Sequence, residues 1–190
     1  ACLVGSEMCI RDRCVIVTTS AENWSMEELS SVSIDDEKAG ETIVDYLIEH
    51  GHTKIAEIGA NLELSQTARL RHNGYLNSLK KHGITPDERY YERARFSYDS
   101  AYRAMKKLLE KDIEITAVYA ISDVMAIGAL RAILDKGLRV PEDISITGFD
   151  GSTLAEYYNP KIVSIRQPHK DMAARSVELP VSYTHLRAHE

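Results

Sequence analysis

The chain has 190 residues, of which 44% are hydrophobic and 27% are charged, and its formal net charge is −6 at pH 7. This length and composition suit one globular domain or two small lobes with a sizeable apolar core. Nucleic-acid-binding surfaces gather Lys and Arg against phosphates, so an acidic chain without a basic stripe is not expected to hold DNA itself. We expect no membrane contact either, because no apolar stretch is long enough for a transmembrane helix.

The two ends of the chain can be translated from opposite strands of one oligonucleotide. Reverse translation of residues 3–12 gives a DNA whose complementary strand encodes residues 181–190. That oligonucleotide resembles a transposase-type sequencing adaptor, so we predict that residues 1–13 and 180–190 are adaptor-derived and do not belong to the fold. Cys14 is then the one remaining cysteine, which favours a reduced cytosolic protein without a disulfide framework.

Strand-like and helix-like segments alternate along the first third of the chain, which predicts an α/β fold. The β-branched run over residues 14–19 is typical of a strand covered on both faces. A helix is expected over residues 37–50, and the strand over residues 54–59 that follows implies a right-handed parallel crossover. Glu57 interrupts this second strand, and we expect it to face the surface of its lobe. The predicted apolar stripe of the helix consists of Ala39, Ile43, Tyr46 and Leu47.

The alternation continues to the carboxyl end of the chain. The expected elements are a helix over 65–82, an extended stretch over 90–96, a helix over 99–111, a strand over 115–121, a helix over 124–136, a strand over 144–147, a short helix over 153–158, a strand over 162–165 and a helix over 169–179.

The stretch VPEDISITGFDG, residues 140–151, combines a turn at Pro141 with a short strand that we expect to end at Gly148. Polar residues that close a parallel strand lie at the carboxyl edge of the sheet, where ligands bind. Asp150 is therefore a candidate contact for a small polar molecule. Its spacing fits a cap of the helix that begins near Ser152 equally well.

Four segments together resemble the sensor domain of the LacI/GalR family of bacterial transcription regulators. They are residues 35–40 with Gly51-His52, residues 69–75, residues 122–129 and residues 140–151. The resemblance extends from about Val15 to Leu179 and depends on the linked order of these motifs. It implies a two-lobed periplasmic-binding-protein-like fold in which each lobe is a doubly wound parallel sheet. Residues 14–60 and 168–179 are assigned to the first lobe, which is incomplete, and residues 61–167 to the second.

The resemblance also implies a set of effector-binding residues. Asp35 is placed beside an effector hydroxyl, and Asp36 is left as the helix cap. Arg71, three residues before Gly74-Tyr75, takes the place of the family's effector-binding arginine, whose planar fork suits two sugar hydroxyls or a carboxylate. From the residue pattern alone, Arg71 fits a surface position, Phe96 fits core packing and the aspartates fit helix caps. The complete implied set is Asp35, Arg71, Phe96, Ser122, Asp123 and Asp150.

The sequence contains no arrangement typical of an enzyme. Its histidines are not at metal-ligand spacing, and it has neither a phosphate-binding glycine loop nor a nucleophile elbow. We therefore predict no catalytic residues, no metal and no cofactor.

The resemblance implies instead a cytoplasmic transcription regulator that binds a sugar or related polyol between its lobes. Operator DNA would be bound only through an amino-terminal helix-turn-helix that this sequence does not include. A homodimer is implied as well, with Met125, Tyr157 and Tyr158 at its interface. The alternative is a periplasmic sugar-binding protein of a transport system, which has the same fold and would be identified by a signal peptide in the parent gene.

Overall fold

The computed structural model describes residues 15–17 and 30–187, with side chains over residues 31–178. The chain divides into two compact units, of which the larger is Asp35–Gln167 and the smaller combines Ala1–Ile34 with Pro168–Glu190. Cys14 and residues 1–13 lie outside the described residues, so the structure does not test what the sequence predicts for them.

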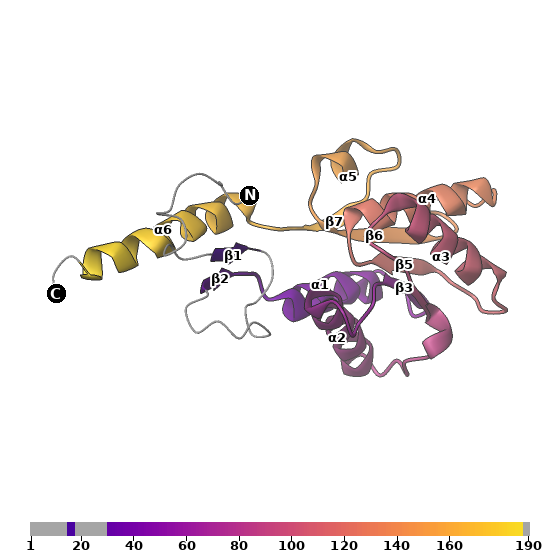
Figure 1. Cartoon of the computed structure of the whole chain (residues 1–190). Coiled ribbons are helices and arrows are strands. Elements are labelled where there is room, and N and C mark those ends of the chain that lie inside the picture. The colour runs from indigo at the N-terminus through magenta and orange to yellow at the C-terminus, as the bar shows by residue number, and fades with distance from the viewer. Residues whose placement is uncertain (1–14, 18–29, 188–190) are drawn as a thin grey trace. The chain divides into compact units, whose positions relative to one another are not determined.

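The smaller unit contains a pair of parallel strands and one long helix. Strand β1 (Val15–Val17) pairs with β2 (Ser30–Val32), and helix α6 (His169–Arg187) packs against both (Figure 1). Helix α6 begins where the sequence predicts but continues beyond residue 179 into the stretch assigned to the adaptor. Of the helices that the structure describes, none has the length and apolar character needed to cross a membrane.

The larger unit contains a parallel sheet in the order β4-β3-β5-β6-β7. In chain order this is 2-1-3-4-5, a doubly wound topology whose switch point lies between β3 and β5, and ligands bind such sheets outside the carboxyl ends of the strands at the switch point. The strands are β3 (Ile55–Gly59), β4 (Tyr91–Arg93), β5 (Ala117–Ala120), β6 (Ser145–Asp150) and β7 (Val163–Arg166). The predicted α/β class with parallel strands is confirmed.

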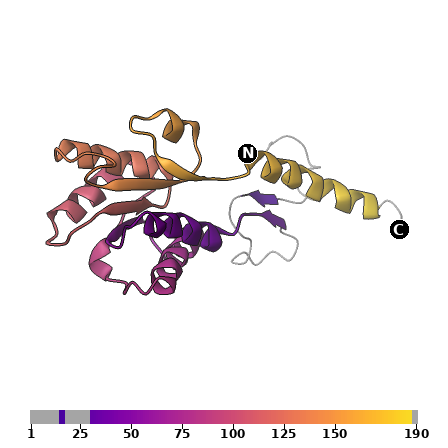
Figure 2. The ribbon, with the colours of Figure 1, turned by 180° about the vertical axis from the view of Figure 1, so that it is seen from behind.

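Helices cover both faces of this sheet (Figures 1 and 2). Helices α1 (Asp36–Glu49) and α2 (Gln66–Lys81) pack on one face, and α3 (Tyr98–Glu110) and α4 (Asp123–Asp135) pack on the other. The short helices η2 (Glu88–Tyr90) and α5 (Thr153–Tyr157) lie in the connections. Because both faces are covered, β3 and β5 are buried at every position, as their nearly continuous apolar sequences indicate.

The structure moves the boundary between the predicted lobes. Residues 35–60, which we assigned to the first lobe, belong to the larger unit because β3 pairs with both β4 and β5 and α1 packs along α2. The polar stretch after β3 is the loop from β3 to α2. The larger unit ends at Gln167, and the chain re-enters the smaller unit at Pro168.

Two local predictions for the sheet are wrong. Strand β6 does not end at Gly148 but continues to Asp150. A Cβ at Gly148 would lie 2.4 Å from Oδ1 of Asp123 and would displace that carboxylate. Glu57 does not face the surface. It is 0% exposed, and its side chain faces α2.

Candidate functional site

Helices α1 and α2 cross in backbone contact at two glycines. A Cβ at Gly40 would lie 2.8 Å from the carbonyl oxygen of Arg71, and a Cβ at Gly74 would lie 2.2 Å from the carbonyl oxygen of Glu37. No side chain fits at either position. The crossing therefore brings the first turn of α1 against the first half of α2, at the carboxyl edge of the sheet.

Arg71 is fixed at this edge by groups from three other elements. Its Nε donates to Oδ1 of Asp36 at 2.7 Å, and its Nη1 donates to the carbonyl oxygen of Ile121, just beyond β5, at 2.6 Å. The guanidinium carbon lies 3.5 Å from the ring centroid of Phe149 on β6, a cation–π contact. Both members of the Asp36–Arg71 pair are buried, with 3% and 5% of the side chain exposed.

Asp150 approaches the same guanidinium from the end of β6. Its Oδ1 lies 3.5 Å from Nη1 of Arg71 and accepts a hydrogen bond from Nε2 of Gln167 at 2.7 Å. The backbone of Asp150 has φ = 121°, a region that residues with a Cβ rarely adopt and that concentrates at functional sites. With 32% of its side chain exposed, Asp150 presents this cluster to solvent.

The two carboxylates share one guanidinium in a partly desolvated site. Burial raises the pKa of Asp36, and the charge and hydrogen bond of Arg71 oppose that rise. Burial likewise raises the pKa of Asp150, against the opposing effects of Arg71 and Gln167. Fixed donors next to fixed acceptors can bind neighbouring hydroxyl groups of a polar ligand. Among the residues that the structure describes, no group of three or more His, Cys, Asp or Glu side chains could hold a metal ion.

The structure assigns the cap of α1 to Asp35 and not to Asp36 as we expected, while contact of Asp35 with an effector stays a prediction. Asp35 is the exposed cap, whose Oδ1 accepts from the backbone N–H of Lys38 at 2.9 Å, whereas Asp36 is the buried partner of Arg71. The buried side of α1 consists of Asp36, Gly40, Ile43, Val44 and Leu47. Our predicted stripe included Ala39 and Tyr46 instead. A stripe drawn through Gly40, Ile43 and Leu47 would have included Asp36.

Ser122 and Asp123 lie at the same edge, but protein groups already satisfy them. Ser122 caps α4 by accepting from the backbone N–H of Met125 at 3.3 Å. Asp123 accepts from the backbone N–H of Ser152 and from the hydroxyl of Ser164, each at 2.6 Å, and so joins α4 to the loop after β6 and to β7. Contact of either residue with an effector stays a prediction.

Phe96 lies between β4 and α3 and is 50% exposed, so its ring is not part of the core. Its contact with an effector is untested. Phe149 and Gln167 support the site but were not predicted from the sequence. Phe149 is fully buried in β6, and nothing in the apolar sequence of that strand distinguishes a ring that touches a guanidinium from one that only packs.

The predicted dimer-interface residues do not share one surface. Met125 is 0% exposed inside the larger unit, so its assignment to an interface is wrong. Helix α4, which carries Met125, is covered by α3 on one side and by β5 and β6 on the other. Tyr157, by contrast, is 84% exposed on α5, beside the partly buried Tyr158.

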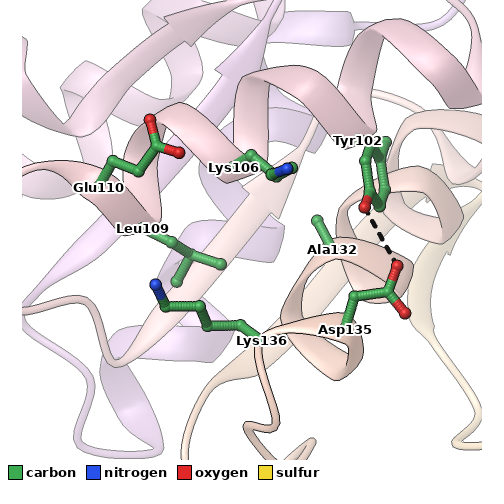
Figure 3. Close-up of a pocket in the computed structure, with 7 residues that line it drawn as sticks. All are labelled: Tyr102, Lys106, Leu109, Glu110, Ala132, Asp135 and Lys136. Carbon is green, nitrogen blue, oxygen red and sulfur yellow. Dashed lines mark hydrogen bonds between the residues drawn. The ribbon is translucent and has the colours of Figure 1, made fainter.

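Two cavities of the larger unit lie apart from the predicted effector residues. One, of about 330 Å³, lies between the later turns of α3 and the end of α4, where the hydroxyl of Tyr102 donates to Asp135 (Figure 3). The other, of about 520 Å³, is lined by the end of α1 and the beginnings of β6 and β7. Because the helices return from the carboxyl edge of the sheet to its amino edge, both cavities are remote from the carboxyl ends of the strands.

Comparison with protein families matches residues 44–188 to the periplasmic binding protein-like domain. The chain belongs to this family. It is 42% identical over 150 residues to the transcriptional regulator MalR of Clostridium butyricum, a match that covers 79% of this chain and 44% of MalR.

Solved structures of LacI-family regulators have the same fold. A sugar-binding regulator of this family from Escherichia coli, in complex with phosphate, has a TM-score of 0.74 and 32% identity over 77% of this chain and 52% of its own. The regulator CelR in complex with cellobiose has a TM-score of 0.80 and 34% identity over 88% of this chain and 50% of its own. The resemblance to the LacI/GalR sensor domain is thereby confirmed, and the chain spans about half the length of the relatives that it matches.

Proposed function

We propose that the chain is the effector-sensing part of a bacterial transcription regulator, and that its ligand is a sugar or related polyol. The relatives MalR and CelR are transcriptional regulators, and the CelR structure holds cellobiose. The structural observation that supports the proposal is the buried Arg71, held by Asp36 and Ile121 at the switch point of the sheet, with Asp150 beside it.

The proposed ligand is bound chiefly by Arg71 and Asp150. Arg71 offers N–H groups in a fixed plane, and Asp150 offers carboxylate oxygens, so adjacent hydroxyls of a sugar find a donor and an acceptor together. Phe96 supplies an exposed aromatic face for the apolar side of the sugar ring. In the proposed site Asp36 orients Arg71, Asp35 contacts an effector hydroxyl, and Ser122 and Asp123 shape the edge around them.

DNA binding is proposed for the remainder of the regulator, in a helix-turn-helix domain, and the effector acts by favouring one arrangement of the protein over another. A homodimer in the cytoplasm, with Tyr157 and Tyr158 at its interface, completes the proposal. We propose no enzymatic activity. The alternative, a periplasmic sugar-binding protein, lacks support from the relatives named above, which are regulators.

Calorimetric titration of the full-length regulator with a panel of mono- and disaccharides, cellobiose included, tests this proposal. We expect saturable binding of one class of sugar, and at least a tenfold loss of affinity in Arg71→Lys, because one ammonium cannot reproduce the guanidinium fork. Arg69→Ala, an exposed neighbour on the same helix, is the matched control and should bind normally. Binding that is equally unaffected by both changes would place the ligand elsewhere.

A further inference from the structure

A carboxylate without any exposed surface lies in the middle of β3. Oε2 of Glu57 is 2.6 Å from Nδ1 of His72 on α2, while Oε1 is buried with no hydrogen-bond partner. His72 retains 18% exposure of its side chain, so the pair connects the interior of the larger unit with solvent. Burying a carboxylate is costly unless it is paired, and this one is paired through a single oxygen.

A second unpartnered polar atom lies on the next strand. Tyr119 of β5 is directly opposite Glu57 in the parallel register, and its hydroxyl is also buried without a partner. Side chains at paired positions of neighbouring strands point to the same face of a sheet. Both atoms therefore lie on the face covered by α1 and α2. Buried polar atoms without partners are rare in folded proteins.

Three tyrosines lie around the pair. The His72 ring stacks 6.1 Å from the ring of Tyr75 on its own helix and meets the ring of Tyr91 on β4 edge-on at 5.1 Å. Burial raises the pKa of Tyr91 to about 12 and raises those of Tyr75 and Tyr119 further, so all three stay neutral. The charges that act on Tyr119, besides that of Glu57, are those of Arg71, Asp36 and Asp150, at the effector site. With the tyrosines neutral, the pH dependence at this place is that of Glu57 and His72, whose pKa values are both raised.

We propose that Glu57 and His72 form a buried proton-binding pair that fastens α2 to β3 and makes the position of Arg71 depend on pH. Arg71 directly precedes His72 on α2 and is held by the same sheet through Ile121. While the pair holds a proton, the carboxylate of Glu57 faces a protonated His72, and their ion pair holds the first half of α2 against β3. Once the proton is lost, Glu57 retains a buried negative charge opposite a neutral imidazole, and this attachment weakens. The consequence for effector binding depends on the function proposed above, whereas the proton-binding pair itself does not.

The direction of the pH effect follows from both partners. Burial raises the pKa of Glu57, and the hydrogen bond and charge of His72 only partly offset it. Burial lowers the pKa of His72, but the hydrogen bond and charge of Glu57 more than compensate, so that this pKa is raised. Each group binds its proton more tightly in the folded than in the unfolded chain. The resulting stability is therefore present at low pH and is lost as the pH rises through the folded pKa of His72.

Urea unfolding of the 190-residue chain from about pH 6 to pH 9 tests the pair, with Glu57→Leu/His72→Leu as the comparison, because apolar residues can replace a buried pair without loss of stability. The folding equilibrium constant of the unaltered chain should fall relative to that of the double variant, by up to tenfold per pH unit for one proton. His82→Gln alters a histidine that is paired with Asp45 at the surface, and its folding equilibrium constant should fall with pH as that of the unaltered chain does. Parallel pH dependences in the unaltered chain and the double variant would overturn the proposal.

The link to Arg71 is measured by nuclear magnetic resonance without any effector. The Nε–H signal of Arg71 should change with the same midpoint as the His72 imidazole, and Glu57→Gln, which keeps the shape of the side chain, should abolish that shared transition. An Arg71 signal that stays constant while His72 titrates would refute the link. Because no sugar enters this experiment, its outcome is independent of whether the proposed effector site is correct.

Discussion

Arg71 of α2 and Asp36 of α1 form an ion pair of 2.7 Å, and both side chains are buried although they lie near the carboxyl edge of the sheet. Removing two charges from water is costly, and a pair of this kind contributes more to orientation than to stability. Its effect here is to fix the guanidinium plane in front of Asp150 before any ligand arrives, which reduces the entropy lost on binding.

Breaking the pair from one side should destabilise the chain strongly. Asp36→Ala leaves the Arg71 charge buried and without its closest partner, and we expect a loss of about 3–5 kcal/mol in the free energy of unfolding. Asp35→Ala removes only an exposed helix cap and should cost about 0.5–2 kcal/mol. Urea unfolding of both variants gives the comparison. Equal losses of unfolding free energy in the two variants would show that the ion pair of Asp36 contributes no more to stability than the helix cap of Asp35.

The contact between α1 and α2 should not tolerate a side chain at Gly74. A methyl group there would lie 2.2 Å from the carbonyl oxygen of Glu37, so the helices must separate. We expect Gly74→Ala to lower the free energy of unfolding by about 1–3 kcal/mol, the range for overpacking, despite the better helix propensity of alanine. Lys80→Ala, at an exposed position of the same helix, should stay within about 0.5 kcal/mol of the unaltered chain. A stabilised Gly74→Ala would contradict the close crossing.

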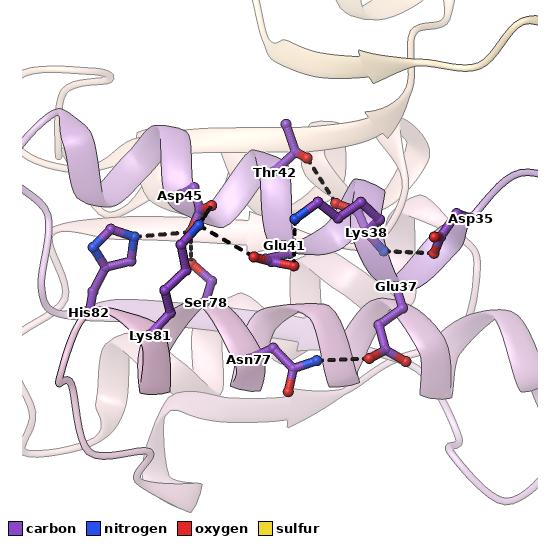
Figure 4. Close-up of polar contacts among 10 residues, drawn as sticks. All are labelled: Asp35, Glu37, Lys38, Glu41, Thr42, Asp45, Asn77, Ser78, Lys81 and His82. Carbon is purple, nitrogen blue, oxygen red and sulfur yellow. Dashed lines mark hydrogen bonds and ion pairs between the residues drawn. The ribbon is translucent and has the colours of Figure 1, made fainter.

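Farther along the same two helices, Asp45 should lose its stabilising contacts in acid. Its carboxylate faces Ser78, Lys81 and His82 of the neighbouring helix (Figure 4). Burial raises the pKa of Asp45, but hydrogen bonds from these three side chains outweigh burial and lower it below 3.8. A lowered pKa contributes stability above the unfolded value, and this is lost as the pH falls through the folded value.

Asp45→Asn should therefore reduce the free energy of unfolding at pH 7 by about 0.2–1 kcal/mol for each pair that it weakens. The difference from the unaltered chain should shrink as the pH falls below 3.8, the ordinary pKa of the carboxylate. Thermal unfolding of both proteins at pH 7 and below pH 3.8 measures this difference. Asp135→Asn, which alters an exposed ion pair on α4, is the control and should have a smaller effect. If the loss of stability in Asp45→Asn is undiminished in acid, the loss comes from packing and not from the charge of Asp45.

The proposed dimer should depend on the exposed aromatic residue of α5. Tyr157 is 84% exposed, and aromatic residues are favoured at protein interfaces. Tyr157→Asp in the full-length regulator should shift sedimentation from dimer to monomer, since an unpaired charge in an interface is costly. Leu64→Asp, at an apolar position that is 85% exposed, is the matched control and should leave the dimer intact. A dimer in both variants would remove α5 from the interface.

Most elements of the larger unit could be predicted from the sequence, because a helix or strand of a doubly wound fold has a recognisable period and end signals. Boundaries of α2, α3 and α4 fall within a residue or two of the expected ones. The sequence pattern does not reveal which strands pair with one another in the sheet. Nothing local in residues 54–59 reveals that β3 lies between β4 and β5, and so residues 35–60 were assigned to the other lobe.

The candidate site was predicted through its motifs and not through its packing. Arg71 and Asp150 are 79 positions apart in the sequence but lie close together in the structure. Only the resemblance, which names both as effector contacts, gave a reason to pair them. The burial of Asp36 was missed because the predicted stripe of α1 was drawn through Ala39 and Tyr46 and not through Gly40. Glu57 was misplaced because a polar residue in a strand was assumed to be exposed. Met125 was misplaced because the resemblance alone does not reveal that this residue is buried under α3 and the sheet.

The last prediction separates backbone strain from ligand contact at Asp150. Its φ of 121° is accessible to glycine and strained for residues with a Cβ, at a cost of order 1–3 kcal/mol. Asp150→Gly and Asp150→Ala both remove the carboxylate, but only the glycine variant relieves the strain. We therefore expect Asp150→Gly to have a free energy of unfolding about 1–2 kcal/mol higher than that of Asp150→Ala.

Binding should not follow stability in these two variants. If Asp150 accepts a hydroxyl of the effector, both should lose the same part of the affinity, about tenfold or more, because the unpaired ligand hydroxyl is the same in each. Calorimetry on the full-length regulator measures the affinities, and chemical unfolding measures the stabilities. Should the glycine variant bind as tightly as the unaltered protein, Asp150 would be a strained structural residue, and the acceptor of the effector would have to be sought elsewhere around Arg71.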